Sequence, residues 1–165
     1  MSLEPVIGID LGPLVVCCAL GTSEHPQLLR DPAGAWELRE CQDEKAALSY
    51  VAELIGRRGR CYVAMESTFT EKRRKHLFKA DVGRNQEGQA RYLTAKLEDW
   101  PEVIEVLRVQ PQTETDGFAA WCAFGRPTLR GPSLGVHKKD SLAAALAGIV
   151  LLEDRRKEPM MEAVG

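Results

Sequence analysis

Long hydrophobic runs are absent from this 165-residue sequence. No apolar stretch reaches the roughly 18 residues that a membrane-spanning helix needs, so we expect no such helix. The first residues, MSLEP, lack the basic and apolar regions of a secretory signal peptide. We therefore expect a cytoplasmic protein. With 44% hydrophobic residues the chain can fill one sizeable core, and we expect a single domain over residues 1–165 with a frayed tail at about 155–165.

Metal-binding cysteine patterns are also missing. The chain has five cysteines, and they form no CxxC pair and no Cys/His spacing of the kind that assembles a zinc site. They are Cys17, Cys18, Cys41, Cys61 and Cys122. We expect them to be thiols buried in the core.

A large net charge is missing as well, because 24 acidic residues nearly balance 22 basic ones and the net charge is -2. This balance excludes a uniformly basic nucleic-acid binder. The charge is unevenly spread, however. Between residues 72 and 91 seven basic residues stand against two acidic ones, and between residues 126 and 140 four stand against one. Two basic segments on an otherwise acidic chain indicate a local site for a polyanion, although a basic run is also typical of a solvated helix surface.

Hydrophobic patterning predicts an α/β fold. Two apolar runs separated by Gly12-Pro13 indicate an antiparallel hairpin, and alternation after the turn DPAG indicates a third strand. Helical spacing of apolar residues and a following GRRG segment predict the first helix. The expected strands are residues 5–12, 14–20, 35–41, 61–67 and 103–109, and the expected helices are residues 43–55, 90–97 and a last one from about His137. We expect a mixed five-stranded sheet, its first three strands antiparallel, with helices on both faces.

Asp10 is unusual because it lies within the apolar run VIGIDLG. A lone buried carboxylate costs several kcal/mol unless it is paired, hydrogen-bonded or bound to a metal. Glu66 ends the fourth strand, and Asp140 lies in the first turn of the last helix, three residues after His137. If the first and fourth strands are neighbours, these acids converge. Clustered carboxylates favour a hard divalent cation with oxygen ligands.

Three of these residues also have a purely structural explanation. Asp140 would complement the dipole of its helix, His137 would be an ordinary residue near a helix start, and Glu66 would be the polar end of a strand. Asp10 is the hardest to explain in this way, because an acid inside an apolar strand has little structural purpose.

Three motifs in order resemble those of the RuvC-type Holliday junction resolvases, which belong to the ribonuclease H-like (retroviral integrase) superfamily of metal-dependent nucleases. GIDLG is similar to the family's first-strand GIDPG, and MESTF to its fourth-strand Glu followed three residues later by Phe. HKKDSLAAALAG is similar to the closing helix, in which Asp or His stands three residues before an Asp. The resemblance covers about residues 5–153 and implies a ribonuclease H-like fold.

The resemblance implies that Asp10, Glu66, His137 and Asp140 are the catalytic metal ligands. Two Mg²⁺ or Mn²⁺ ions would bridge the scissile phosphate, one activating water and the other stabilising the leaving 3′-oxygen. Asp10 would bridge both ions, Glu66 and Asp140 would each hold one, and His137 would be a ligand or a general acid/base.

The family's substrate is four-way (Holliday) junction DNA, which a homodimer cuts by two symmetric nicks during recombination and repair. A twofold dimer matches a junction of near-twofold symmetry. We expect the dimer interface on the helix around residues 85–97, at Tyr92, Leu93 and Leu97. Branch-migration proteins are further expected partners, and the cellular context would be a bacterium or a phage in its host cytoplasm.

The resemblance also implies DNA-binding residues. Phe69 corresponds to the aromatic residue that stacks into the junction, although a core Phe is the structural alternative. The family's lysine near Pro111 is absent here, and Arg126, Arg130 or Lys138 are candidates to replace it. The basic candidates for phosphate contacts are Lys72, Arg73, Arg74, Lys75, Arg84, Arg126, Arg130, Lys138 and Lys139.

Other functions share parts of this pattern. IGIDLG also resembles the phosphate-binding strand of actin-like and sugar-kinase ATPases, but that fold needs two such domains. A non-catalytic junction-binding protein, with His137 marking a decayed site, is a second alternative. A ribonuclease H-like nuclease that acts on RNA:DNA hybrids is a third.

Overall fold

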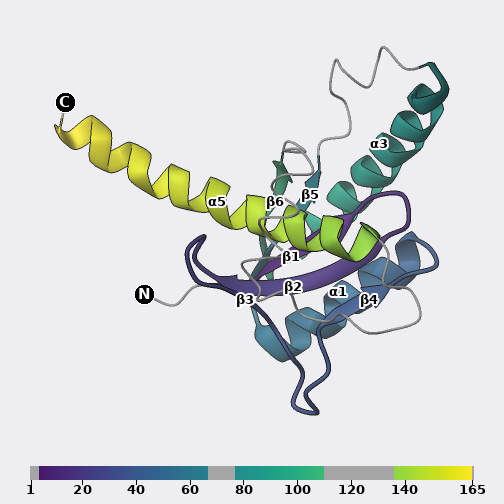
Figure 1. Ribbon diagram of the computed structural model, residues 1–165, viewed down its shortest axis with the longest axis horizontal. Coiled ribbons are helices and arrows are strands. Elements are labelled where there is room, and N and C mark those ends of the chain that lie inside the picture. Colours follow the sequence, from purple (N-terminus) through teal and green to yellow (C-terminus); the bar gives the residue numbers. More distant parts are fainter. Residues whose placement is uncertain (1–3, 67–76, 110–135, 165) are drawn as a thin grey trace.

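The computed structural model describes residues 4–66, 77–109 and 136–164, with side chains described for residues 4–65, 86–109 and 140–157. One sheet in order β3-β2-β1-β5-β6 forms its centre, and β4 also pairs with β2 (Figure 1). The strands are β1 (Val6–Asp10), β2 (Val15–Gly21), β3 (Pro26–Leu28), β4 (Leu38–Glu40), β5 (Cys61–Glu66) and β6 (Val103–Val109). The helices are α1 (Glu44–Arg58), α3 (Leu77–Leu97) and α5 (Val136–Val164).

The sheet is mixed, as the sequence predicted. β1 and β2 form an antiparallel hairpin, whereas β1 pairs with β5, and β5 with β6, in parallel. The predicted third strand at residues 35–41 is confirmed only as the short β4, which pairs antiparallel with β2 along Val15–Cys17. β3, which was not predicted, pairs antiparallel with β2 along Ala19–Gly21, so the described sheet has six strands rather than the predicted five. Between β3 and β4 Asp31 accepts hydrogen bonds from the amides of Ala33 and Ala35, which closes a turn outside the sheet.

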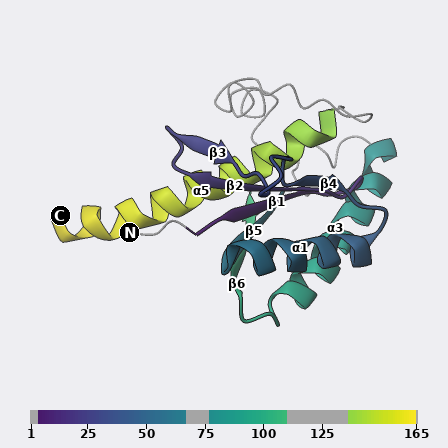
Figure 2. The same ribbon diagram turned by 90° about the horizontal axis from the view of Figure 1, so that it is seen from below.

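Helices cover both faces of the sheet, as predicted (Figure 2). Successive side chains of β1 point to opposite faces, so each face has its own apolar surface for a helix to cover. On one face lie α1 and α3, and on the other lies α5. The first core cluster includes Ile7, Ile9, Ala47, Val51, Leu54, Ala90, Leu93 and Leu97. The second includes Val6, Ala64, Leu107, Leu142, Ala145 and Ile149.

The prediction that Leu93 and Leu97 form a dimer interface is wrong. Both leucines are fully buried in the chain's own core, packed beneath the sheet. Tyr92, the third residue of that group, is 42% exposed. The apolar spacing of this helix therefore reflects packing against its own sheet rather than against a second copy.

A second buried carboxylate, Glu37, connects the β3–β4 region to the end of α1. Glu37 is 1% exposed and accepts hydrogen bonds from Arg57 at 3.2 Å and from Arg58 at 2.9 Å. The side chain of Arg58 also donates to the main-chain carbonyl of Arg30. The two guanidinium groups offset the cost of burying the Glu37 carboxylate, and the hydrogen bond to it raises the pKa of Arg58.

Two helices are longer than the sequence predicted. α3 begins at Leu77 rather than near residue 90. α5 continues to Val164, through the tail for which we expected fraying, and its C-terminal part extends beyond the sheet (Figure 1). Its middle is held by contacts across the fold: Ser23 N–H donates to Glu153 at 2.8 Å, and Arg155 donates to Glu105 at 2.6 Å. None of the helices in the described ranges combines the length and the apolar character that crossing a membrane requires.

α5 packs directly on the backbone of the sheet. A Cβ built on Gly8 of β1 would meet the Ser141 carbonyl and lie 2.6 Å from the Ala145 amide nitrogen. A Cβ built on Gly148 of α5 would lie 2.9 Å from the Ala64 side chain. These glycines and alanines let the helix approach the sheet closely, as the Ala-rich segment of the sequence predicted.

We predict that Gly8→Ala lowers the free energy of unfolding by about 3 kcal/mol, because the added methyl would displace the α5 backbone. Urea unfolding measures this change. Gly56→Ala is the control: Gly56 lies in α1 with open space around its Cα. That substitution should raise the stability by up to about 1 kcal/mol, since Ala favours a helix over Gly. Equal stability of Gly8→Ala and the wild type would contradict the close packing of α5 on β1.

Candidate functional site

α5 and β1 run in opposite directions across the sheet. Gly8 lies against Ser141 and Ala145, whereas Val6, two residues earlier in β1, lies 3.0 Å from the Cβ that Gly148 would carry. Moving toward the start of β1 therefore means moving toward the end of α5. The start of the helix consequently lies at the end of the strand where Asp10 is found.

The same register locates Asp10 relative to α5. Two strand residues advance about 7 Å, which equals the rise of about four to five helical residues. The step from Gly8 to Val6 agrees with this ratio, because the facing helix position moves from Ser141–Ala145 to Gly148. The same step in the other direction brings Asp10 level with residues 137–140, the first turn of α5. Asp10 also shares the face of Gly8, the face that α5 covers.

Glu66 ends the strand next to β1. The parallel register pairs Ile9 with Met65, so Asp10 and Glu66 occupy the next positions of adjacent strands. Adjacent strands lie about 4.8 Å apart, and Glu66 has the same alternation as Ala64, which faces α5. The backbone positions of Asp10, Glu66 and the α5 start are therefore close. The side chain of Glu66 lies outside the described residues.

The acidic residues at this end of the sheet differ in exposure. Asp10, the one charged residue of an otherwise apolar strand, is only 5% exposed. Asp140 is half-buried. Ser141, the next residue, is fully buried against β1. Position 137 lies one helical turn before Ser141 on the same helix face. Its side chain, that of the candidate ligand His137, lies outside the described residues.

The donor atoms that these positions supply suit a hard divalent cation. Three of the four candidates are carboxylates and the fourth is an imidazole, a set that fits Mg²⁺ or Mn²⁺. Among the side chains that the structure describes, no group of three or more His, Cys, Asp or Glu forms a metal site. Of the four candidates, Asp10 and Asp140 belong to that described part of the chain.

The four cysteines that the structure describes are core thiols. Burial raises the pKa of Cys17 to about 12, and hydrogen bonds with the Ser141 side chain and the Gly8 backbone offset that effect only in part. Burial also raises the pKa of Cys61 to about 12 and those of Cys18 and Cys41 above the usual range. Burial therefore favours the neutral thiol over the thiolate at each of these positions. The prediction of buried thiols is confirmed for these four, and Cys122 lies outside the described residues.

Most of the predicted DNA-binding residues lie outside the described residues, and their roles stay predictions. Three have a described backbone only: Arg84 lies in α3, and Lys138 and Lys139 lie in the first turn of α5. The others, together with Pro111, fall outside the described ranges entirely: Phe69, Lys72, Arg73, Arg74, Lys75, Arg126 and Arg130.

Two glutamines that the sequence analysis missed contact the turn directly after Asp10. Gln89 accepts a hydrogen bond from the Gly12 amide at 2.8 Å, and Gln86 lies 3.4 Å from the Leu11 carbonyl. Both belong to the part of α3 that precedes the predicted helix start. Their spacing of three residues on one helix face was the signal available in the sequence.

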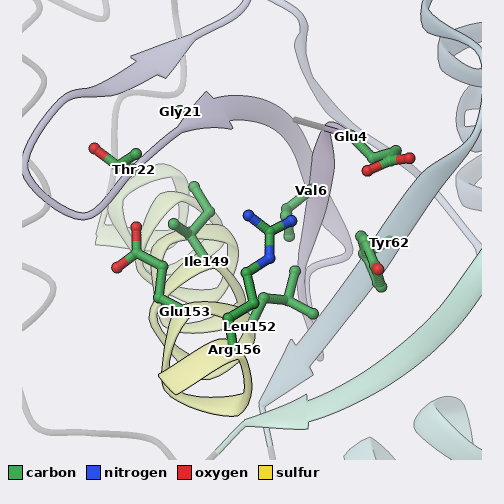
Figure 3. Close-up of a pocket in the computed structure, with 9 residues that line it drawn as sticks. All are labelled: Glu4, Val6, Gly21, Thr22, Tyr62, Ile149, Leu152, Glu153 and Arg156. Atoms are coloured by element: carbon green, nitrogen blue, oxygen red, sulfur yellow. The ribbon is translucent and has the colours of Figure 1, made fainter. Parts of the chain in front are cut away.

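A cavity lies at the opposite end of β1, about 13 Å from Asp10 along the strand. Its walls include the apolar side chains of Val6, Ile149 and Leu152, with Glu153 and Arg156 beside them (Figure 3). The cavity volume is about 90 Å³. Typical small-molecule sites have about 300–1,000 Å³. This cavity is therefore separate from the acidic end of the sheet and too small for a nucleotide.

Comparison with solved structures identifies the fold. Thermus thermophilus RuvC in complex with a Holliday junction substrate is similar with a TM-score of 0.53 and 18% identity, over 92% of this chain and 96% of that one. A second Thermus thermophilus RuvC structure gives a TM-score of 0.51 and 17% identity, over 92% and 97%. No protein-family model matches the chain, and no curated protein matches it by sequence. The resemblance indicated by the three motifs is confirmed at the level of the fold, which is the ribonuclease H-like fold of RuvC.

We predict that Mg²⁺ or Mn²⁺ stabilises the wild-type protein through the acidic end of the sheet. At a cation concentration one hundred times Kd the gain is about 2.7 kcal/mol, which corresponds to a rise in Tm of about 5–10 °C for a chain of this length. Asp10→Asn should abolish the rise because it removes a carboxylate ligand. Differential scanning calorimetry with and without the cation measures the effect.

Asp99→Asn is the matched control, because Asp99 is an exposed acid that follows α3. It should keep the wild-type response. An equal rise in Tm for wild type and Asp10→Asn would show that the cations bind elsewhere.

Proposed function

We propose that this protein is a RuvC-type endonuclease that resolves four-way DNA junctions by metal-dependent phosphodiester hydrolysis. The observation that supports it is the register of β1, β5 and α5, which brings the positions of Asp10, Glu66 and Asp140 to one end of the sheet. The likeness to RuvC adds the fold, and one of the similar structures is a complex of RuvC with a Holliday junction substrate.

Asp10, Glu66 and Asp140 would hold the divalent cations, Mg²⁺ or Mn²⁺, through their carboxylates. When bound, the ions supply Lewis-acid stabilisation of the phosphate and a water nucleophile at neutral pH. The protein's own contribution is to hold these three carboxylates in position. Asp10 lies on a strand paired on both sides, with β2 and β5, so its backbone is held in place before any ligand arrives.

His137 would either complete the ligand set or move a proton. It occupies the first turn of α5, on the helix face that continues to Ser141. An imidazole is suited to exchange a proton with an attacking water or a leaving oxygen near neutral pH. The proposed products are 5′-phosphate and 3′-hydroxyl ends.

The DNA would be held by basic residues of the two segments 72–91 and 126–140. α3 and the first turn of α5 carry Arg84, Lys138 and Lys139. Basic side chains of this kind bind phosphates without reading sequence, which suits recognition of a DNA shape. We further propose that residues 1–165 form one nuclease domain, that it acts as a homodimer making two symmetric nicks, and that it works in the cytoplasm of a bacterium, as a cellular or a phage protein.

The first test is substrate choice. Purified protein should nick a synthetic four-way junction in Mg²⁺ or Mn²⁺ and leave linear duplex, flap and RNA:DNA hybrid substrates largely uncut. Denaturing gels of end-labelled strands resolve the nicks and show whether they are symmetric. Preferred cutting of the hybrid would favour a ribonuclease, and junction binding without any cutting would favour a non-catalytic binding protein.

We predict that Asp10→Asn retains junction binding but loses cleavage by at least about a thousandfold. The ions supply several kcal/mol to the transition state, and each 1.36 kcal/mol is a factor of about ten in rate. Gel-shift titration in EDTA and single-turnover cleavage in Mg²⁺ measure the two quantities separately. Asp99→Asn should behave as wild type in both. Cleavage by Asp10→Asn at the wild-type rate would refute the assignment.

A further inference from the structure

The turn that follows Asp10 has an unfavourable backbone conformation. It covers residues 11–14 between β1 and β2. Gly12 has φ +96°, which glycine adopts readily. Leu14 has φ +56°, a left-handed conformation that is costly for a leucine. A turn of this kind needs contacts from the rest of the fold to hold one conformation.

Several contacts hold this turn. Leu11 and Leu14 are each 2% exposed, and the Leu14 carbonyl accepts a hydrogen bond from the Cys41 amide at 3.0 Å. These contacts fix the two ends of the turn. The middle of the turn, at Gly12, is held from α3.

Gln86 and Gln89 of α3, which we name the glutamine clamp, bind that middle part. Gln89 accepts from the Gly12 amide at 2.8 Å, and its own amide lies 3.4 Å from the Gly12 carbonyl. Gln86 donates to the Leu11 carbonyl at 3.4 Å. A Cβ on Gly12 would lie 3.0 Å from the Gln86 amide nitrogen, which is a tight contact, and the positive φ of this position itself favours glycine.

The chemistry of glutamine suits this place. A carboxamide both donates and accepts, so one side chain can bind the main-chain N–H and C=O of a single residue, as Gln89 does at Gly12. It is also neutral. A Glu in its place would add charge beside an acidic site, and a Lys would offer no acceptor.

We propose that Gln86 and Gln89 are positioning residues for Asp10, which set the affinity of the acidic site for divalent cations by fixing the turn that follows this carboxylate. This inference rests on the proposed function of that site. Groups that orient a metal ligand from behind change metal affinity or activity by about 10–100-fold when they are removed. The glutamine clamp acts on the backbone within two residues of Asp10, so an effect of this size is expected.

The test replaces the amides by an apolar side chain of similar length. Methionine has a helix propensity close to that of glutamine, so Gln86→Met, Gln89→Met and the double variant should keep α3 helical. Isothermal titration of the full chain with Mn²⁺ should show an affinity about 10–100-fold lower for the double variant. Gln89→Met should have the larger single effect, because Gln89 makes the short hydrogen bond and contacts both polar groups of Gly12.

Two further measurements separate positioning from loss of stability. Hydrogen exchange of the Gly12 amide should accelerate in Gln89→Met, while exchange of core amides in β1 and β5 stays as in the wild type. The control is Glu87→Gln, which lies between the two glutamines but removes an ion pair from α3 to Arg108 of β6 at 3.0 Å. It should loosen the same helix and leave the affinity for Mn²⁺ unchanged.

The outcomes distinguish this inference from the proposed function. If the wild type binds no Mn²⁺, both fail. If the wild type binds Mn²⁺ and the double variant binds it equally well, the proposed function stands and the clamp inference is wrong. An equal loss of affinity in Glu87→Gln would also overturn it, because general loosening of α3 would then explain the effect. Should the double variant not fold, the ranking of the two single variants decides.

Discussion

The close approach of α5 to β1 is the constraint on which the rest of the structure depends. Gly8 of β1 leaves room for the backbone of α5. Gly148 of α5 in turn leaves room for the side chains of Ala64 and Val6 in the sheet. Because contact is made at backbone distance, the helix has little freedom to slide. The first turn of α5 is therefore held at the end of the sheet where β1 and β5 also end. A side chain of ordinary size at position 8 would displace the α5 backbone at Ser141 and Ala145 from β1.

Among the described side chains, two carboxylates are buried, and their surroundings differ. Glu37 lies in the β3–β4 region, and Arg57 and Arg58 offset its charge at hydrogen-bond distance. This is a structural arrangement that ties an edge of the sheet to α1. Asp10 instead lies where two further acidic positions of the chain converge, and we propose divalent cations as the compensating charge. The acid of the apolar run VIGIDLG is the last residue of β1, so it lies at the end of the sheet rather than in its middle.

The packing of helices on both faces of a mixed sheet was predictable from local patterns. Two apolar runs around Gly12-Pro13 gave the hairpin, and the small-residue segment after Asp140 indicated close packing on a sheet. The length of α3 was not predictable, because residues 77–89 carry no continuous apolar stripe in the sequence, and the described residues 86–89 are held by contacts distant in sequence. Examples are the ion pair of Glu87 with Arg108 and the hydrogen bonds of Gln89 with Gly12. For the same reason Leu93 suggested a dimer interface: a single helix does not reveal which partner its apolar face contacts.

On the function that we propose, the carboxylates of residues 10, 66 and 140 bind the same divalent cations. The most direct measurement is an anomalous difference map from a crystal of the protein soaked in Mn²⁺. The account predicts peaks at the shared end of β1 and β5, each at coordination distance from carboxylate oxygens of at least two of these residues. A map with no peak there, or one in which these three side chains point apart, would contradict it.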